Sequence, residues 1–188
     1  MSVFASTSAG RSENDVLSKC SNKFALKASY GTMIASEQFE HIWQLFEQNM
    51  RALYAKSDWG WNEKEKRSEL QSTTSRYLIV TNSGDNDVDG DLVAFCHYRF
   101  VLEIGQPVLY CYELQVAKRH QRTGVGRWLL AILHELASRL HMSKVMATVF
   151  KFNEQSLAFF TTLGFAVDEL SSFESNDYLV LSKPVVLA

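Results

Sequence analysis

The strongest periodic pattern in the chain lies between Ser36 and Ala55, where apolar residues recur at intervals of three and four positions. They are Phe39, Ile42, Trp43, Phe46, Met50 and Leu53. This spacing predicts an amphipathic helix, and Ser36 is a suitable N-cap for it. A second, shorter helix is predicted from Asn62 to Leu70. Its run of charges indicates a face in contact with solvent rather than a binding patch.

Compact apolar runs predict the strands of a sheet in the first half of the chain. These runs are Phe24–Tyr30, Tyr77–Thr81, Leu92–Glu103 and Val108–Val116. Gly105, Gln106 and Pro107 separate the last two runs, and a turn of this composition between long strands predicts an antiparallel hairpin. The segment 82–91, which contains two glycines, is expected to be a turn region.

The second half of the chain alternates helices and strands. The predicted elements are a helix over Val125–Leu140, a strand over Lys144–Phe150, a helix over Ser156–Leu163 that stops at Gly164, and strands over Phe165–Leu170 and Asp177–Lys183. This order predicts a single α/β domain in which helices cover the faces of a mixed sheet. We assign residues 1–21 to a flexible or docked N-terminal arm and residues 22–188 to the domain.

Composition restricts the classes of function. Hydrophobic residues make up 46% of the 188 positions and the formal net charge is −2, so a globular protein without direct nucleic-acid binding is expected. No apolar stretch has the length of a membrane span, and no feature requires more than a monomer. Cys20, Cys96 and Cys111 are expected to be reduced thiols, and no histidine or cysteine spacing predicts a metal site. The expected location is the nucleus and the cytoplasm.

A basic loop with two glycines joins the predicted hairpin to the long helix. Its residues are Gln121, Arg122, Thr123, Gly124, Val125, Gly126 and Arg127. The glycines let the main chain approach a ligand closely, and the helix start adds the positive end of its dipole, which together suit a pyrophosphate. Without further context, such a pair of glycines favours an ordinary strand-to-helix turn over a binding site. Neither the P-loop nor the dinucleotide-binding motif is present, since Leu129 occupies the position of the third glycine.

Two motifs in the correct order resemble the signatures of the GNAT superfamily of N-acetyltransferases. Gln121, Gly124 and Gly126 match its glycine loop, and a helix beginning at Asn153 leads to an aromatic pair and Gly164. The resemblance implies a GNAT-type domain, with a mixed, mostly antiparallel twisted sheet flanked by helices. It implies acetyl-CoA as the acetyl donor and no metal. The donor would be held by Leu114, Gln115, Val116, the loop from Arg122 to Arg127, and Asn153.

Three further strings narrow the resemblance. Trp59-Gly60-Trp61, Tyr110-Cys111-Tyr112-Glu113 and the run from Lys144 to Lys151 are similar to the NatD family of N-terminal acetyltransferases. That family acetylates the N-terminal serine amine of histone H4 and histone 2A, whose chains begin Ser-Gly-Arg-Gly. The resemblance therefore implies the N-terminal tails of these two histones as partners.

The resemblance also implies roles for individual side chains. Catalysis would depend on Glu113 and Tyr112. The peptide would be bound by Tyr54, Trp59, Tyr112, Thr148 and Tyr178.

Two positions depart from the family pattern. Val101 stands where the family carries an aspartate that helps to hold the substrate arginine. The acid that replaces it would be Glu103 or one of Asp168, Glu169, Glu174 and Asp177. Phe160 stands where many superfamily members carry a tyrosine that protonates the departing thiolate, so another group or water would do so here.

The chemistry of acetyl transfer explains why a glutamate is needed. An N-terminal amine has an ordinary pKa of about 8, against about 10.4 for lysine, and loses its proton more readily near neutral pH. Glu113 could accept that proton directly or through water, and burial beside Tyr110 and Tyr112 is expected to disfavour its charged form. Backbone N–H groups of the same strand could stabilise the developing oxyanion. Two alternatives remain open: acetylation of lysine side chains or small amines, and a CoA-binding module without turnover.

Overall fold

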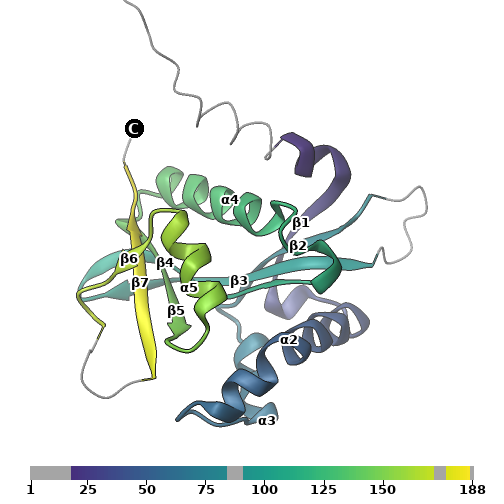
Figure 1. Cartoon of the computed structure of the whole chain (residues 1–188). Coiled ribbons are helices and arrows are strands. Elements are labelled where there is room, and N and C mark those ends of the chain that lie inside the picture. The colour runs from purple at the N-terminus through teal and green to yellow at the C-terminus, as the bar shows by residue number, and fades with distance from the viewer. Residues whose placement is uncertain (1–17, 84–90, 172–176, 187–188) are drawn as a thin grey trace, which may run out of the picture.

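The computed structural model describes residues 18–83, 91–171 and 177–186. One sheet runs through the molecule, and its strands follow the order β1-β2-β3-β4-β5-β7-β6. Figure 1 shows α4 and α5 on one face of this sheet and α2 with α3 on the other. Neighbouring strands are antiparallel except for β4 and β5, which are parallel. The predicted mixed, mostly antiparallel sheet flanked by helices is confirmed.

The element bounds agree closely with the sequence pattern. The strands are β1 (Phe24–Tyr30), β2 (Arg76–Asn82), β3 (Leu92–Glu103), β4 (Gln106–Val116), β5 (Lys144–Phe150), β6 (Ala166–Val167) and β7 (Tyr178–Pro184). The helices are α2 (Ser36–Lys56), α3 (Glu63–Leu70), α4 (Val125–Arg139) and α5 (Glu154–Thr162), with 3-10 turns η1 (Gly31–Met33) and η2 (Lys118–His120). The expected strand over Phe165–Leu170 is reduced to the two residues of β6, and the expected turn falls largely in residues 84–90, outside the described residues.

Local chemistry fixes where three of the helices begin or stop. The side chains of Asn62 and Asn153 cap α3 and α5, accepting hydrogen bonds from the third backbone N–H beyond them. Gly164, with a φ of +86°, follows the end of α5 as expected. The prediction for α2 was wrong at its start, because Ala35 is the N-cap and Ser36 is already the first helical residue.

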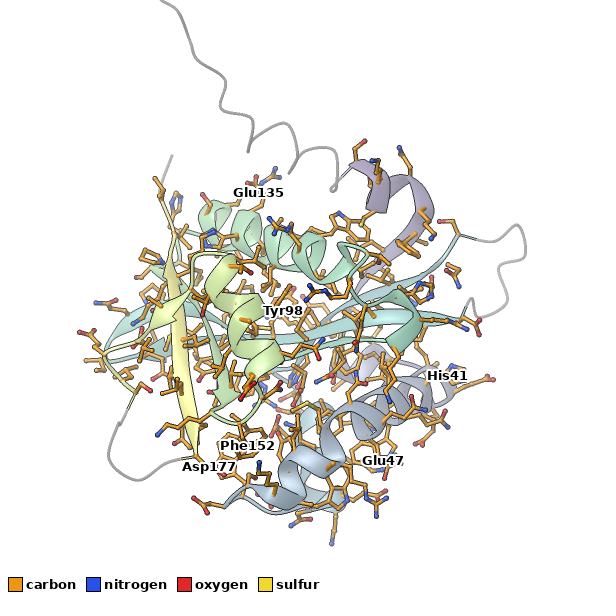
Figure 2. All side chains as sticks on the ribbon, viewed as in Figure 1. His41, Glu47, Tyr98, Glu135, Phe152 and Asp177 are labelled. Carbon is orange, nitrogen blue, oxygen red and sulfur yellow. The ribbon has the colours of Figure 1, made fainter. Side chains whose placement is uncertain are left out.

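The sheet separates two hydrophobic cores. On one face, Leu129 and Leu133 of α4 are fully buried against strand residues such as Val145. On the other, Ile42 and Phe46 of α2 pack on the middle of the sheet. Of the stripe predicted for the first helix, Phe39, Ile42, Trp43 and Phe46 are buried in this second core and Met50 packs against it, whereas Leu53 belongs to neither core. Figure 2 illustrates the sorting: Tyr98 lies in the interior, whereas His41, Glu47 and Glu135 project from the outer faces of their helices.

A bulge in β4 opens the centre of the sheet. In the ladder with β3, Tyr98 pairs with Cys111 but His97 pairs with Glu113, so Tyr112 is an extra residue. The parallel ladder with β5 ends at the same place, with Cys111 opposite Ala147 as its last pair. Beyond that pair β4 and β5 part, and the edge of β4 from Tyr112 to Val116 has no strand beside it on that side.

Two sequence expectations concern segments at the margin of this fold. Residues 1–17 of the expected N-terminal arm lie outside the described residues, while residues 18–23 are helical and bury Cys20 against the core.

Cys96 and Cys111 are free, buried thiols as expected, with their sulfur atoms 3.6 Å apart. Within the described ranges, no helix is long and apolar enough to cross a membrane.

Candidate active site

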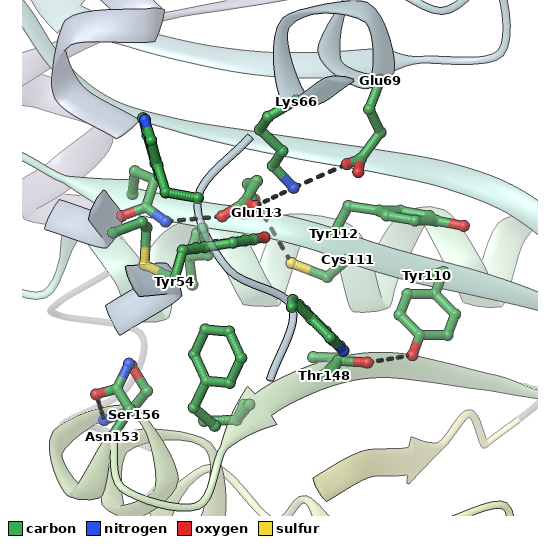
Figure 3. A pocket seen from close by; sticks show the side chains of 18 of the residues that line it. Tyr54, Lys66, Glu69, Tyr110, Cys111, Tyr112, Glu113, Thr148, Asn153 and Ser156 are labelled. Atoms are coloured by element: carbon green, nitrogen blue, oxygen red, sulfur yellow. Dashed lines mark hydrogen bonds and ion pairs between the residues drawn. The ribbon is translucent and has the colours of Figure 1, made fainter. Parts of the chain in front are cut away.

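A cavity of about 640 Å³ lies where β4 and β5 part. It extends from the start of α5, past the bulge in β4, to the region between α3 and the end of β3. Figure 3 shows Tyr54 and Lys66 approaching it from the helical side, Thr148 from β5, and Asn153 with Ser156 from α5. The cavity therefore joins the part predicted to hold the cofactor to the part predicted to hold the acceptor.

Glu113 lies at the middle of this cavity, and its side chain is only 4% exposed. Its Oε1 is 2.7 Å from Nζ of Lys66, and its Oε2 accepts a hydrogen bond of 2.8 Å from Nε2 of Gln115. Gln115 in turn accepts a bond of 3.0 Å from the amide of Asn49 on α2. Glu113 is buried as expected from sequence, but one cation and one amide, neither of them anticipated, hold its carboxylate.

Lys66 is the cation that the sequence reading missed. Its ammonium also lies 2.9 Å from Glu69, and over the rings of Phe46 and Tyr54 at 5.2 and 5.3 Å. Burial opposes its charge, but the attraction of Glu113, with Tyr54 and Glu69, outweighs burial and raises the lysine pKa above its ordinary value. The prediction that the charges of α3 only face solvent was wrong. The side chain of Lys66 points from this helix into the cavity, toward Glu113.

Aromatic rings form the outer wall of the acceptor part. The rings of Tyr54 and Trp59 both pack on Phe150 of β5, at 5.4 and 5.1 Å between centroids. Trp59 is 49% exposed, so one side of its ring stays available to a ligand. Tyr178 was predicted to line the peptide site, but it does not line the cavity. Its ring instead packs behind that of Trp59, with 4.9 Å between the ring centroids, and supports it. The reason is that β7 lies beyond β5, one strand away from the opening.

Thr148, a predicted peptide contact, meets Tyr110 across the opening between the strands. Tyr110 of β4 and Thr148 of β5 share a hydrogen bond of 2.5 Å between their hydroxyl groups. Burial raises the pKa of Tyr110 to about 12, so this hydroxyl stays neutral. Tyr112 lines the cavity next to them, with its ring 5.0 Å from that of Tyr110 and beneath the guanidinium of Arg99.

Carboxylates gather at the acceptor end. Besides Glu113, the acids that line the cavity are Glu65, Glu69 and Glu103. Of the residues considered as substitutes for the missing aspartate, Glu103 is the one that lines the cavity. Asp168 instead bonds Lys144 at 2.6 Å, Asp177 accepts from the backbone N–H of Asp58, and Glu174 lies outside the described residues. Val101 is paired with Val108 in the hairpin and does not line the cavity.

The glycine loop lies beyond the donor side of the cavity, against the terminus of β4, and none of its residues lines the cavity itself. Gly124 is the N-cap of α4 with a φ of +99°, and Arg122 also has a positive φ of +62°. The side chain of Gln121 donates to the carbonyl oxygen of Val116 at 3.1 Å, so it fastens the loop to the strand. A Cβ at Gly126 would lie 3.1 Å from the Phe159 ring, which is why α4 and α5 need a glycine there.

These features fit a long, phosphate-bearing acyl donor. The open edge of β4 offers Leu114 and Gln115 to the cavity, and Asn153, Ser156 and Phe160 line the facing side. The start of α4 supplies backbone N–H groups and the helix dipole for phosphates. Phe160 is 6% exposed and presents a phenyl ring, so no hydroxyl comes from that position. Among the described residues, no cluster of three or more metal-binding side chains occurs.

An enzyme that moves an acyl group from such a donor must hold its extended arm along one strand and its phosphates at a helix start, as this opening and loop allow. The sequence bears this out. Residues 38–165 match the model of the acetyltransferase (GNAT) family. Because the match spans more than half of the chain, the chain belongs to this family, and it is an acetyl-CoA-dependent acetyltransferase.

Solved structures share the same fold at low sequence identity. The ribosomal-protein-S18-alanine N-acetyltransferase from Escherichia coli is 17% identical, with a TM-score of 0.57, covering 87% of this chain and 96% of that one. NAA60 from Arabidopsis thaliana, in complex with a bisubstrate analogue, is 12% identical, with a TM-score of 0.63 over 86% of this chain and all of the other. The NatC complex bound to Gag peptide and CoA is 14% identical, with a TM-score of 0.60, covering 86% of this chain and 99% of that one.

Proposed function

We propose that this enzyme acetylates the N-terminal amine of protein chains, and that its substrates are the histone H4 and histone 2A tails that begin Ser-Gly-Arg-Gly. The observation that carries the proposal is the position of Glu113. Its buried carboxylate lies where the open edge of β4 meets an acid- and tyrosine-lined recess. The Trp59-Gly60-Trp61 and Tyr110-Cys111-Tyr112-Glu113 strings, typical of the NatD family, supply residues of that recess.

The residues suit proton removal from an N-terminal ammonium. Acetyl-CoA supplies the acetyl group as a thioester. Glu113 accepts the proton of the acceptor ammonium, directly or through one water, and this leaves an uncharged amine as the nucleophile. An α-amine, with an ordinary pKa of about 8, needs less help than a lysine amine at about 10.4. The rings of Tyr54 and Tyr112 exclude water around the carboxylate and so strengthen its interactions.

The acceptor end also suits the composition of the proposed tails. Glu65 and Glu103 provide carboxylates that can pair with an arginine side chain at the third position. Trp59, Tyr110 and Tyr112 narrow the recess, which favours small residues on either side of the arginine. Both features support a basic peptide over an acidic or bulky one.

An acetylation assay tests the proposal with a Ser-Gly-Arg-Gly peptide and three companions. These are the same peptide with a blocked N-terminus, a Ser-Gly-Ala-Gly peptide, and an N-terminally blocked peptide with an internal lysine. Mass spectrometry should locate the acetyl group on the α-amine of the first peptide, with slower modification of the alanine peptide. Labelling of the blocked peptides at the same rate would instead favour a lysine or small-amine acetyltransferase, and no labelling of any peptide with intact CoA binding would favour a binding module.

Three accompanying proposals follow from the same assignment. The histone tails are the protein partners, the enzyme acts in the nucleus and the cytoplasm, and it is a monomer. Light scattering of the purified chain measures its mass directly, and a dimer at assay concentration would contradict the last proposal. Fractionation of cells that express the tagged protein tests its location.

A further inference from the structure

Resting on the proposed role of Glu113 as base, we infer that Lys66 is a positioning residue for acetyl transfer, whose ammonium keeps the Glu113 carboxylate ionised and oriented toward the acceptor amine. None of the motifs contains this lysine. It comes from α3, a helix that contributes no residue to the cofactor end of the cavity. The inference concerns how the base is prepared, not which group is the base.

The contacts of Glu113 divide between fixing its charge and fixing its direction. Lys66 approaches Oε1 at 2.7 Å, and Gln115 donates to Oε2 at 2.8 Å, so each oxygen keeps one lone-pair direction for a proton. The side chain of Glu113 is 4% exposed and that of Lys66 is 11% exposed. Water therefore screens their attraction poorly, and an isolated carboxylate at this depth would favour its neutral form. A neutral carboxyl could not accept the substrate's proton.

Lys66 is itself held in place. Glu69 lies 2.9 Å from its ammonium (Figure 3). The rings of Phe46 and Tyr54 lie beneath the same ammonium, which restrains a side chain that is otherwise flexible. The cluster of Glu69, Lys66 and Glu113 carries one negative charge in excess. An incoming ammonium compensates that excess, so the acceptor is drawn in as a cation and gives up its proton at Glu113.

Other charged and titratable groups face the pair from the surrounding elements. They are Tyr54 of α2, Glu69 of α3, Tyr77 of β2, and Cys96, His97 and Arg99 of β3. Burial raises the pKa values of the two tyrosines and of the cysteine thiol, and lowers that of His97 to about 3. These four groups are therefore neutral throughout the pH range of an assay, so a change in the pH profile of a Lys66 or Glu69 variant does not come from them.

Opposite pH shifts in two variants test the inference. The pH dependence of kcat/KM is measured with the Ser-Gly-Arg-Gly peptide for Lys66→Met, Lys66→Arg and Glu69→Gln. Lys64→Met, an exposed lysine of the same helix, is the matched control. Lys66→Met should lower kcat/KM about 100-fold at pH 7. On the acidic side of the pH profile, where kcat/KM falls with falling pH (the acidic limb), its midpoint should move to higher pH by about one unit or more. Lys66→Arg should return the midpoint of the acidic limb to its value in the parent enzyme. Glu69→Gln should move that midpoint to lower pH, because a negative neighbour of Glu113 has been removed.

A second measurement does not depend on turnover. The ¹³C NMR titration of the Glu113 carboxyl carbon, assigned by its absence in Glu113→Gln, should shift in the same directions without acetyl-CoA. Calorimetric CoA affinity should stay within about twofold in all four variants, because the donor site is separate. Should Lys66→Met fail to fold, Lys66→Arg and Glu69→Gln still decide the question through the limb and the titration.

The outcomes separate this inference from the proposed function. Wild-type turnover in Glu113→Gln would remove the base itself, and with it the proposed mechanism. An inactive Glu113→Gln, combined with an unmoved acidic limb and carboxyl titration in every soluble Lys66 and Glu69 variant, would overturn only the role of Lys66. Equal losses of activity in Lys64→Met and Lys66→Met would also overturn it, since the effect would then be one of helix charge in general.

Discussion

The two ends of the cavity differ in what forms them. The donor end relies mainly on main chain: the edge of β4 that β5 leaves unpaired lines it, and beyond the cavity lie a glycine with φ of +99° at the cap of α4 and a glycine pressed against Phe159. The acceptor end consists of side chains that converge from four separate elements. There Lys66 of α3 meets Glu113 of β4, and Tyr54 of α2 meets Phe150 of β5.

This difference matches the tasks of the two ends. A donor with phosphates and an extended arm can be bound through N–H groups and a helix dipole, which nearly any sequence with the right glycines can provide. Choosing one amine among many requires charge and shape, which only side chains provide. Substitutions at the donor end should therefore change CoA affinity, and those at the acceptor end should change turnover or peptide recognition.

The largest effect is expected from Glu113→Gln. The amide keeps the shape of the side chain but cannot accept the ammonium proton, so kcat should fall by about 10²- to 10⁴-fold. Stopped-assay rates with saturating peptide measure this, and calorimetry should find the CoA affinity unchanged. Glu135→Gln, on the exposed face of α4, is the control and should behave as the parent enzyme. Retention of most turnover in Glu113→Gln would mean that the two ends do not divide their tasks in this way.

Gly126→Val should produce the complementary defect. Its Cβ would lie 3.1 Å from the ring of Phe159 and its methyl groups closer still, so α4 must move away from α5. Overpacking of this kind costs roughly 1–3 kcal/mol, which would correspond, if all of it falls on the donor site, to about a 5- to 150-fold weaker CoA affinity. Peptide KM at saturating acetyl-CoA should change little. Gly105→Ala, in the β3–β4 turn, has open space around its Cβ but a φ of +75°, so it carries backbone strain without a clash and should leave the CoA affinity unchanged.

A buried histidine of β3, His97, should make folding stability depend on pH. His97 is fully buried and bonds Ser75 at 2.9 Å, and burial, with the nearby charges of Arg99 and Lys66, lowers its pKa from 6.5 to about 3. Between those two pH values the unfolded chain binds the proton and the folded chain does not. Stability therefore falls as the pH falls through this window, by about 1.4 kcal/mol per pH unit from this residue.

Urea unfolding at intervals from pH 7 to pH 4 measures that slope. His97→Gln should flatten it by the stated amount, whatever its effect on stability at pH 7. His41→Gln, which changes an exposed histidine on α2, should leave the slope as it is. If the slope in His97→Gln differs from that of the parent no more than the slope in His41→Gln does, His97 takes up its proton in the folded state as readily as in the unfolded chain.

The smallest effect is expected from Trp59→Ala. Removing an exposed ring that packs on Tyr54, Phe150 and Tyr178 should raise the peptide KM about five- to tenfold, with CoA affinity unchanged. Tyr178→Leu should give a weaker change in the same direction, because Tyr178 acts through Trp59. Leu140→Ala, a partly exposed residue at the end of α4, is the control. A Tyr178 effect larger than that of Trp59 would place the peptide nearer to β7.

Most of the fold and the donor end could be predicted from the sequence because their signals are local. Leu129 and Leu133 lie four positions apart and so share the face of α4 that packs on the sheet, and the two apolar runs with the turn between them predicted the hairpin of β3 and β4. Gly124 and Gly126 indicated a helix start suited to phosphate. Such patterns depend on residues a few positions apart, where backbone geometry alone decides which side chains share a face.

The acceptor end depends on contacts that no short pattern contains. The charges of Glu63, Lys64 and Lys66 look alike along the chain, yet the orientation of α3 exposes the first two and buries the third beside Glu113. The acid at Glu113, within a largely apolar strand, indicates a cationic partner but does not indicate which of these cations it is.

The sequence by itself determined the family of this enzyme, the order of its elements and the loop for its donor, because each rests on neighbouring residues. Only the tertiary structure decided that β4 and β5 part at Cys111 and Ala147, that Tyr178 stands behind Trp59, and that Lys66 reaches Glu113. The physical reason is that these contacts join distant segments, and packing of the two cores on the sheet brings those segments together.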